Sequence, residues 1–355
     1  MEPSSRSPRL NRDESLDAFR GLAIVGMVAA NFMADKIIVP PWLKHAPDIG
    51  YTLIDLIAPL FVVAMASSFR LSLERRRSRF MESARKPGSS SQESLFSYRG
   101  PDWRGPIAWS ALGLIGIGSV LSAGQGLVMP EGGLIDWGVL QALGLAEFAL
   151  LYLYDVPRWS RAVLALALMV VYQVVMPESL PLLLGRTHGG LIGAVDWIAL
   201  ILLADCSLGW WTKPGRQFIA GAALTAVGWA GSLILPLSKN RVSPDYVIVS
   251  LGLSLVVLSA LRLWYELRPV RKPARPGLSG LKSPIRLFGS HPLGLYLGHE
   301  LLLSMFVFPP FVQWGSDAPL ATCAAQLILL YCMLAALAIF LEWRRPVLAP
   351  GGAAA

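Results

Sequence analysis

Charged residues are scarce in this chain: Asp, Glu, Lys and Arg make up 15% of its 355 residues, whereas 54% are hydrophobic. This composition excludes an ordinary soluble enzyme, and the apolar runs have the length of about 20 residues that crosses a bilayer core. The three cysteines, Cys206, Cys323 and Cys332, all fall inside apolar runs. They show neither the placement of an extracellular disulfide nor a metal-ligand spacing, so we expect no redox chemistry and no metal.

The chain also lacks a soluble domain, because no loop is long enough to bury a core of its own. Its net charge of +8 does not indicate nucleic acid, since the basic residues gather in short segments between apolar runs, as in cytoplasmic loops. The first apolar run has no clear cleavage site and carries Asp17, Arg20 and Asn31. We therefore expect a retained helix there and not a signal peptide.

These features predict an all-α polytopic membrane protein with about ten transmembrane helices and both termini in the cytoplasm. The spans are expected near residues 16–38, 52–73, 107–124, 134–154, 160–176, 191–211, 217–237, 245–265, 286–308 and 320–342. This topology places 24 Lys and Arg residues in cytoplasmic segments and five outside, in agreement with the positive-inside rule.

The predicted organisation is a cytoplasmic tail (1–15), a transmembrane domain (16–345) and a C-terminal tail (346–355). Two long cytoplasmic segments, 74–106 and 267–285, are rich in Ser, Pro, Gly and Arg. We expect them to be flexible or to lie on the membrane surface, and we assign them no catalytic role.

Ionisable side chains within the bilayer are costly, so each is a functional candidate that faces the bundle interior or water. On the first helix Asp17, Arg20 and Asn31 project to one side and form a polar stripe across much of the bilayer. The alternative is a local Asp17–Arg20 pair with a structural asparagine.

A second group of polar residues gathers at the outer mouth of the first two spans. The predicted topology brings Asn31, His45 and Asp55 to a similar depth. His45 is suited to proton exchange near neutral pH, an Asp orients an imidazole, and an Asn donates to an oxygen that gains negative charge. A solvated loop histidine is the plain alternative.

Further polar residues lie along later spans. The ninth span carries His291 near its cytoplasmic end and the His299–Glu300 pair deeper, either as catalytic groups or as a structural hydrogen-bond network. The fourth span carries Asp136, Gln141 and Glu147 as tunnel lining or as contacts between helices. Three more intramembrane candidates are Asp196, Asp205 and Arg262, whereas His188 lies in an outer loop where we expect it to be solvated.

Five motifs in order resemble the heparan-α-glucosaminide N-acetyltransferase family of transmembrane acyltransferases. The first is SLDAFRGLAIVGMVAANF, a helical segment that ends near Asn31. The second is WLKHAPDIGYTLIDLIAPLF, which contains the Lys44-His45-Ala46 motif. The others are Gly138-Val139-Leu140-Gln141, Lys239-Asn240 and Tyr296-Leu297-Gly298-His299-Glu300. The resemblance therefore covers most of the membrane region.

The resemblance implies acetyl transfer from cytosolic acetyl-CoA to an amine, expected on an amino sugar or glycan, on the other side of the membrane. It implies that His45 is the catalytic residue and that Asn31 assists it, either through an acetylated histidine or by deprotonation of the acceptor in a ternary complex. Coenzyme binding is assigned to Arg20, Arg262 and Arg286, which offer cations to the phosphates, together with Gln141 and His299.

Some features depart from the family pattern. Asp136 and Ala142 replace arginines around the GVLQ motif, and Thr187-His188-Gly189-Gly190 replaces a DPEG segment, which places the acceptor in doubt. Only about 15 residues precede the first motif, which suggests a compact microbial member in a cytoplasmic membrane, whereas animal members lie in the lysosomal membrane. The family also suggests a homodimer. Two other functions stay open: a transporter or channel for a small polar solute, and a structural protein whose polar residues only hold helices together.

Overall fold

A computed structural model describes residues 13–84, 104–128, 137–184, 187–267, 283–307 and 315–344. The described residues contain helices and no strands. The helices are α1 (Glu14–Met33), α2 (Ile57–Ala84), α3 (Gly105–Val128), α4 (Val139–Leu153), α5 (Arg158–Leu184), α6 (Gly190–Trp210), α7 (Pro214–Gly231), α8 (Pro244–Glu266), α9 (Pro284–Ser290), α10 (Pro292–Val307) and α11 (Leu320–Arg344). The predicted all-α class is confirmed.

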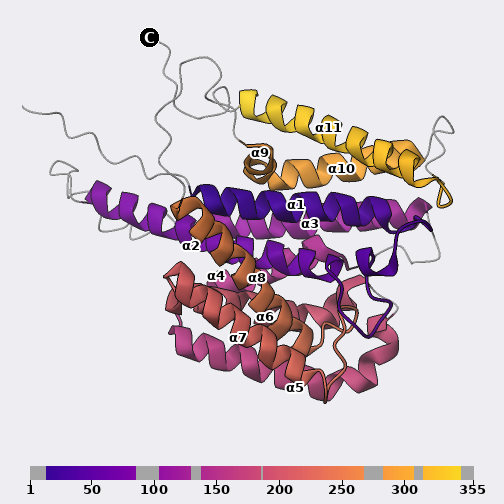
Figure 1. Ribbon diagram of the computed structural model, residues 1–355. Coiled ribbons are helices and arrows are strands. Elements are labelled where there is room, and N and C mark those ends of the chain that lie inside the picture. Colours follow the sequence, from indigo (N-terminus) through magenta and orange to yellow (C-terminus); the bar gives the residue numbers. More distant parts are fainter. Residues whose placement is uncertain are drawn as a thin grey trace, which may run out of the picture. The chain divides into compact units, whose positions relative to one another are not determined.

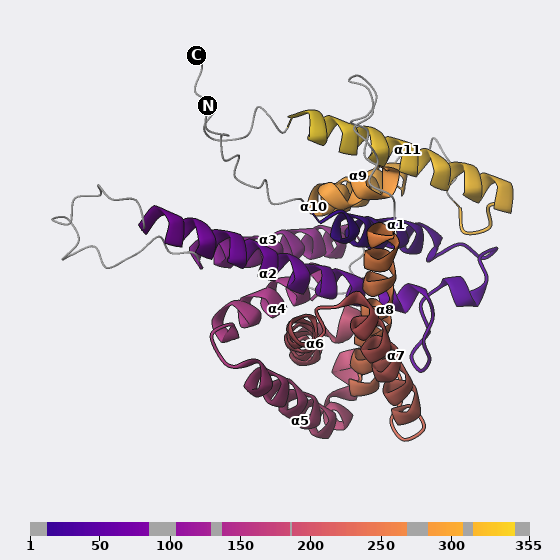
Figure 2. The ribbon, with the colours of Figure 1, turned by 60° about the vertical axis from the view of Figure 1, so that its left-hand side comes forward.

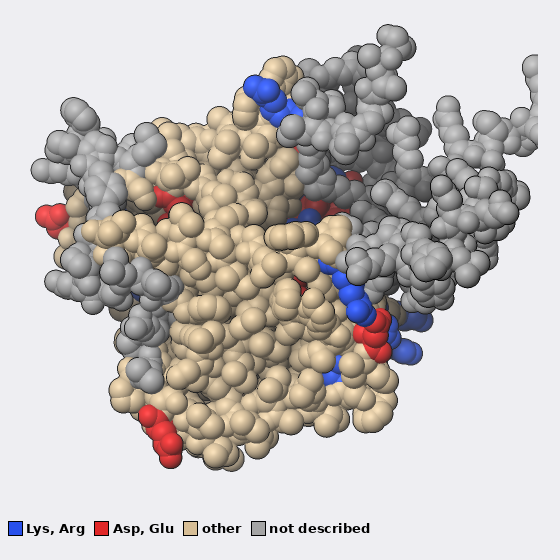
Figure 3. Space-filling view, turned by 180° about the vertical axis from the view of Figure 1, so that it is seen from behind, with Lys and Arg blue, Asp and Glu red and all other residues tan. Residues whose placement is uncertain are grey.

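Seven helical segments within the described residues are long and apolar enough to cross a bilayer. They are 14–33, 54–73, 105–124, 158–181, 190–210, 244–266 and 320–344. Charged groups are sparse on the face seen in Figure 3, where most of the coloured surface carries neither Lys, Arg, Asp nor Glu. The protein is therefore a polytopic membrane protein, while ten spans with cytoplasmic termini stay a prediction.

One expected span is wrong. The ninth span was expected as one helix, but it is divided into α9 and α10 at His291, whose backbone is not helical (φ −136°, ψ 54°). The following Pro292 explains the break, because proline disfavours a helical conformation in the residue before it and begins a new helix well. Helix α2 continues to Ala84, into the segment 74–106, whose flexible or surface-lying character stays a prediction. Residues 85–103 and 268–282 lie outside the described part of the chain, as does Asp136.

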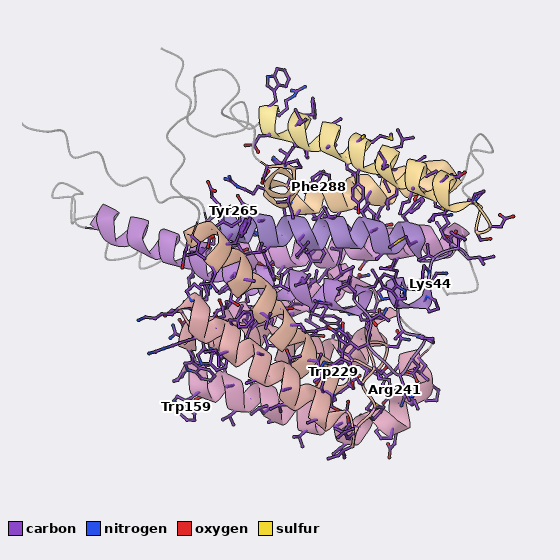
Figure 4. The ribbon with its side chains drawn as sticks, in the orientation of Figure 1. Lys44, Trp159, Trp229, Arg241, Tyr265 and Phe288 are labelled. Carbon is purple, nitrogen blue, oxygen red and sulfur yellow. The ribbon has the colours of Figure 1, made fainter. Side chains whose placement is uncertain are left out.

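The chain forms two compact units. Unit 1 comprises residues 1–40 and 257–355, and unit 2 comprises residues 41–256. In unit 1, α1 packs against α9 and α10, and α11 packs against the same two helices (Figure 1). Glycines allow α1 and α9 to touch, because a Cβ on Gly289 would lie 1.7 Å from the Asp17 carbonyl oxygen. Phe288, labelled in Figure 4, packs from α9 against Tyr331 of α11.

In unit 2, α6 is the central helix. It packs against α2, α4 and α5, and Figure 2 views it nearly along its axis with α4 and α5 beside it. Side chains such as Trp197, Leu200 and Leu202 on this helix are fully buried. Because α6 is covered by its neighbours, its polar side chains are removed from water, and both oxygens of the fully buried Asp196 have no hydrogen-bonding partner among the described residues.

Candidate active site

His45 is hydrogen-bonded to Asp55 in unit 2. The two residues lie at the entry to α2: His45 belongs to the loop that follows the short helix Pro41–Leu43, and Asp55 belongs to the short helix Ile54–Leu56. Their contact joins His45 Nδ1 to an Asp55 carboxylate oxygen at 2.7 Å. The Asp55 side chain is fully buried, whereas 39% of the His45 side chain is exposed. The imidazole is therefore fixed on its inner side and open on its outer side.

The other contacts of Asp55 determine which nitrogen of His45 carries the proton. The second Asp55 oxygen accepts hydrogen bonds from the Thr52 amide at 2.9 Å, the Thr52 hydroxyl at 3.0 Å and the Ala46 amide at 3.3 Å. A carboxylate surrounded by donors acts as an acceptor, so His45 Nδ1 donates to it. The free electron pair of the neutral ring is then on Nε2, which is the arrangement of a general base or a nucleophile.

A second loop holds the His45 loop in place. Arg241, on the loop between α7 and α8, pairs through Nε and Nη2 with Asp48, and Asn240 Nδ2 donates to the Pro47 carbonyl at 2.6 Å. Arg241 and Lys44, the neighbour of His45, are labelled on these loops in Figure 4. The hydrogen bond from Arg241 lowers the pKa of Asp48 and raises that of the guanidinium. The two loops are thus joined within three residues of His45.

Two cationic or titratable residues near this pair were not predicted as site residues. Lys239 is 7% exposed, and burial lowers its pKa although the charge of Asp55 opposes the shift. His188 is half-buried, so its expected solvation is wrong; its Nδ1 is buried and has no hydrogen-bonding partner among the described residues. Burial, followed by the charges of Lys239 and His45, lowers the pKa of His188. Only the approach of distant loops places these residues together.

Asn31 meets His299 in unit 1. The Asn31 side-chain nitrogen lies 2.9 Å from His299 Nε2, and His299 Nδ1 contacts the Tyr296 carbonyl oxygen. A carbonyl accepts only, so Nδ1 donates to it and Nε2 accepts from the Asn31 amide. His299 is fully buried and its Nε2 lies 3.5 Å from Glu300. The network alternative for His299 is thus supported, and the pairing of Asn31 with His45 stays a prediction.

The residues expected to bind the coenzyme are engaged in different ways. Arg20 pairs with Asp17 at 3.0 Å, as the local-pair alternative predicted, and Arg286 pairs with Glu14 at 2.9 Å. On α4, Gln141 is buried, donates to Ser122 at 3.1 Å and accepts from the Gly138 amide. Arg262 is half-buried on α8. Their role in coenzyme binding stays a prediction.

Comparison with known proteins agrees with the motif order. The model of the family described as heparan-alpha-glucosaminide N-acetyltransferase, catalytic, matches residues 12–301. The chain is 32% identical over 154 residues to the heparan-alpha-glucosaminide N-acetyltransferase of Mus musculus and 34% identical over 152 residues to that of Homo sapiens. Each alignment covers 41% of this chain but only 20% and 19% of the mouse and human proteins.

The family match includes His45, Asp55, Asn31 and His299, and therefore both polar clusters. Because the match covers well over half of the chain, the chain belongs to the heparan-alpha-glucosaminide N-acetyltransferase catalytic family.

Proposed function

We propose that this protein transfers an acetyl group from cytosolic acetyl-CoA to an amine, on an amino sugar or a related glycan, across the cytoplasmic membrane of a microbe. The observation that carries the proposal is the His45–Asp55 pair, in which Nδ1 is occupied at 2.7 Å and the ring is partly exposed. Membership of an N-acetyltransferase catalytic family supports the reaction class. The names of the mouse and human relatives, heparan-alpha-glucosaminide N-acetyltransferase, support acetyl transfer and a glucosaminide acceptor.

Two reaction routes use the same imidazole. In the direct route, the acceptor nitrogen attacks the thioester carbonyl while His45 Nε2 takes the proton of that nitrogen. The C–N bond forms and the C–S bond breaks. The proton then passes from Nε2 to the coenzyme thiolate. In the covalent route, Nε2 itself attacks the thioester carbonyl, and the C–S bond breaks as the coenzyme thiolate leaves. The acceptor amine then attacks the acetylated ring, the new C–N bond forms as the bond to Nε2 breaks, and the amine proton passes through the freed Nε2 to the thiolate. In both, Asp55 holds the tautomer and stabilises the imidazolium.

Asn31 is proposed to assist this chemistry. Its amide nitrogen carries two hydrogens, of which one is donated to His299. The second is available for an oxygen that gains negative charge as the acetyl group is transferred. Arg20, Arg262, Arg286, Gln141 and His299 are proposed to contact the coenzyme, and the family suggests a homodimer.

The test is mass spectrometry of products formed by the purified protein from labelled acetyl-CoA and a panel of amino sugars, with His45→Ala and Asn31→Ala beside the wild type. We expect an acetylated product from the wild type, none from His45→Ala at equal expression, and a slower reaction from Asn31→Ala. A label on the intact protein without acceptor indicates the covalent route, and its absence with active enzyme indicates the direct one. A protein that binds a solute but leaves acetyl-CoA intact is a transporter, which would overturn the proposal.

A further inference from the structure

A second charged cluster lies in unit 2, on the part of α2 that is remote from His45. It consists of Arg70 on α2, Arg158 and Arg161 at the start of α5, and Asp205 on α6. Arg161 Nη1 lies 2.7 Å from one Asp205 oxygen, and Arg70 Nη1 lies 3.5 Å from the other. Arg158 Nη1 donates to the Gly209 carbonyl at 3.4 Å, near the end of α6. Trp159, labelled in Figure 4, marks this end of α5.

Two of these guanidinium groups converge on one point. A Cβ on Gly209 would lie 2.6 Å from both Arg158 Nε and Arg70 Nη1. These two nitrogens are therefore within about 5 Å of each other, a distance at which like charges repel. Glycine at position 209 leaves room for both side chains.

The charges of this cluster are not balanced by its own described residues. Arg70 and Arg161 share one carboxylate, that of the fully buried Asp205, and among the described residues the Arg158 guanidinium is paired only with the Gly209 carbonyl. The Arg161 side chain is only 3% exposed, and its Nε is buried without a hydrogen-bonding partner among the described residues. Buried charge is costly unless an opposite charge compensates it. Arg70, at 15% exposed, and the exposed Arg158 leave the cluster accessible to an anion.

The separation from His45 suggests which anion. Asp55 and Arg70 are 15 residues apart along nearly continuous helix, which corresponds to about 22 Å. The predicted topology places Asp55 at the outer face and Arg70 at the cytoplasmic face. In coenzyme A the pantetheine arm separates the thioester from the phosphates by an extended chain of this order of length. Planar guanidinium groups bind phosphate through paired hydrogen bonds.

We propose that Arg70, Arg158 and Arg161 bind a phosphate group at the nucleotide end of the acyl-CoA donor, an inference that rests on the proposed transferase function. An anionic lipid headgroup offers the same phosphate chemistry, so the experiment separates the two sources. Arg158→Gln is the main variant, because its side chain is exposed and its removal leaves the Asp205 pairs intact. Arg70→Gln is the second variant, and Arg216→Gln, an exposed arginine at the start of α7, is the matched control.

The first measurement compares acetyl-CoA with S-acetylpantetheine, which has the thioester but no phosphate. For Arg158→Gln and Arg70→Gln we expect the KM for acetyl-CoA to rise at least about tenfold, the loss of one charged hydrogen bond. We expect kcat/KM for S-acetylpantetheine and all constants of Arg216→Gln to stay unchanged. An equal loss with both substrates, or no loss in either variant, would overturn the assignment.

The second measurement does not depend on catalysis. Adenosine 3′,5′-bisphosphate is titrated into the purified full-length chain in nanodiscs of phosphatidylcholine, with or without phosphatidylglycerol. Weaker binding to both variants, in either lipid, supports the phosphate site even where no acetyl transfer is found. Equal binding to wild type and variants overturns the site while leaving the transferase intact. Bisphosphate binding that is equal in wild type and variants, with less phosphatidylglycerol co-purifying with the variants, would assign the cluster to lipid and refute the coenzyme assignment.

Discussion

Replacement of Asp55 by asparagine is the sharpest test of the proposed active site. The change keeps the size of the side chain but removes one acceptor from a buried group that accepts four hydrogen bonds, from His45, Ala46 and, twice, Thr52. If the new amide nitrogen faces His45, Nδ1 must accept and Nε2 carries the proton, so the base is lost. If it faces Thr52 and Ala46, their donors lose their acceptor.

The structure sets the expected size of this effect. General base catalysis by a positioned side chain contributes about 100- to 10,000-fold, and loss of the correct tautomer removes it. We therefore expect kcat to fall about 100- to 10,000-fold, which corresponds to a loss of about 3–5 kcal/mol of transition-state stabilisation. The alternative orientation leaves a buried donor unpaired and lowers the free energy of unfolding by about 1–3 kcal/mol.

The assay is single-turnover acetyl transfer by the purified variant, with thermal unfolding as a measure of folding. Asp35→Asn is the matched control, because the Asp35 side chain is 65% exposed and its variant should keep wild-type kcat. The double variant with His45→Ala should be no slower than His45→Ala alone, since the two residues act as a unit. A folded Asp55→Asn protein with near-normal kcat, or a loss that adds fully to that of His45→Ala, would refute the role of the pair.

Three further predictions concern the packing of α1 and α9 in unit 1 and the loops around His45 in unit 2. Gly289→Ala places a methyl group 1.7 Å from the Asp17 carbonyl oxygen of α1. We expect the free energy of unfolding to fall by at least about 1–3 kcal/mol. The control Gly113→Ala, whose Cβ would have no atom within 4 Å, should be neutral. Arg241→Gln removes the pair with Asp48. We expect faster hydrogen exchange in residues 46–52 and a loss of about 0.5–1 kcal/mol in the free energy of unfolding. Unchanged exchange would argue against the loop contact. His188 has a lowered pKa in the folded protein, so below its ordinary value of about 6.5 the unfolded chain binds the additional proton. Stability should therefore fall between pH 7 and pH 5, by up to about 1.4 kcal/mol per pH unit, and the His188→Gln variant should show a shallower pH dependence of its unfolding temperature.

Much of the local order could be predicted from the sequence. The apolar runs place helices at every expected span, because the length of a bilayer-crossing segment and its hydrophobicity are properties of neighbouring residues. The contact of His45 with Asp55 could also be predicted, since ten residues separate them and the predicted topology brings them to one depth. Pro292 is a local signal for the break at His291, because proline disfavours a helical conformation in the residue before it.

Contacts between distant segments could not be predicted in this way. Nothing along the chain indicates that Arg241 joins Asp48 or that Asn31 donates to His299, since each pair is separated by about 190 or more residues and depends on how the helices pack. The convergence of Arg70 and Arg158 over Gly209 is of the same kind, because two arginines in separate cytoplasmic segments are explained equally well by topology.

The sequence by itself determined that this is a membrane-embedded helical protein with an N-acetyltransferase-like motif order and a histidine at the mouth of its first two spans. Those features depend on composition, on segment length and on short motifs. Only the tertiary structure decided which side chains complete the polar clusters, which nitrogen of His45 is engaged, and where arginines exceed their acidic partners. Burial and hydrogen-bond geometry arise from packing between helices, and the sequence of one segment alone does not determine that packing.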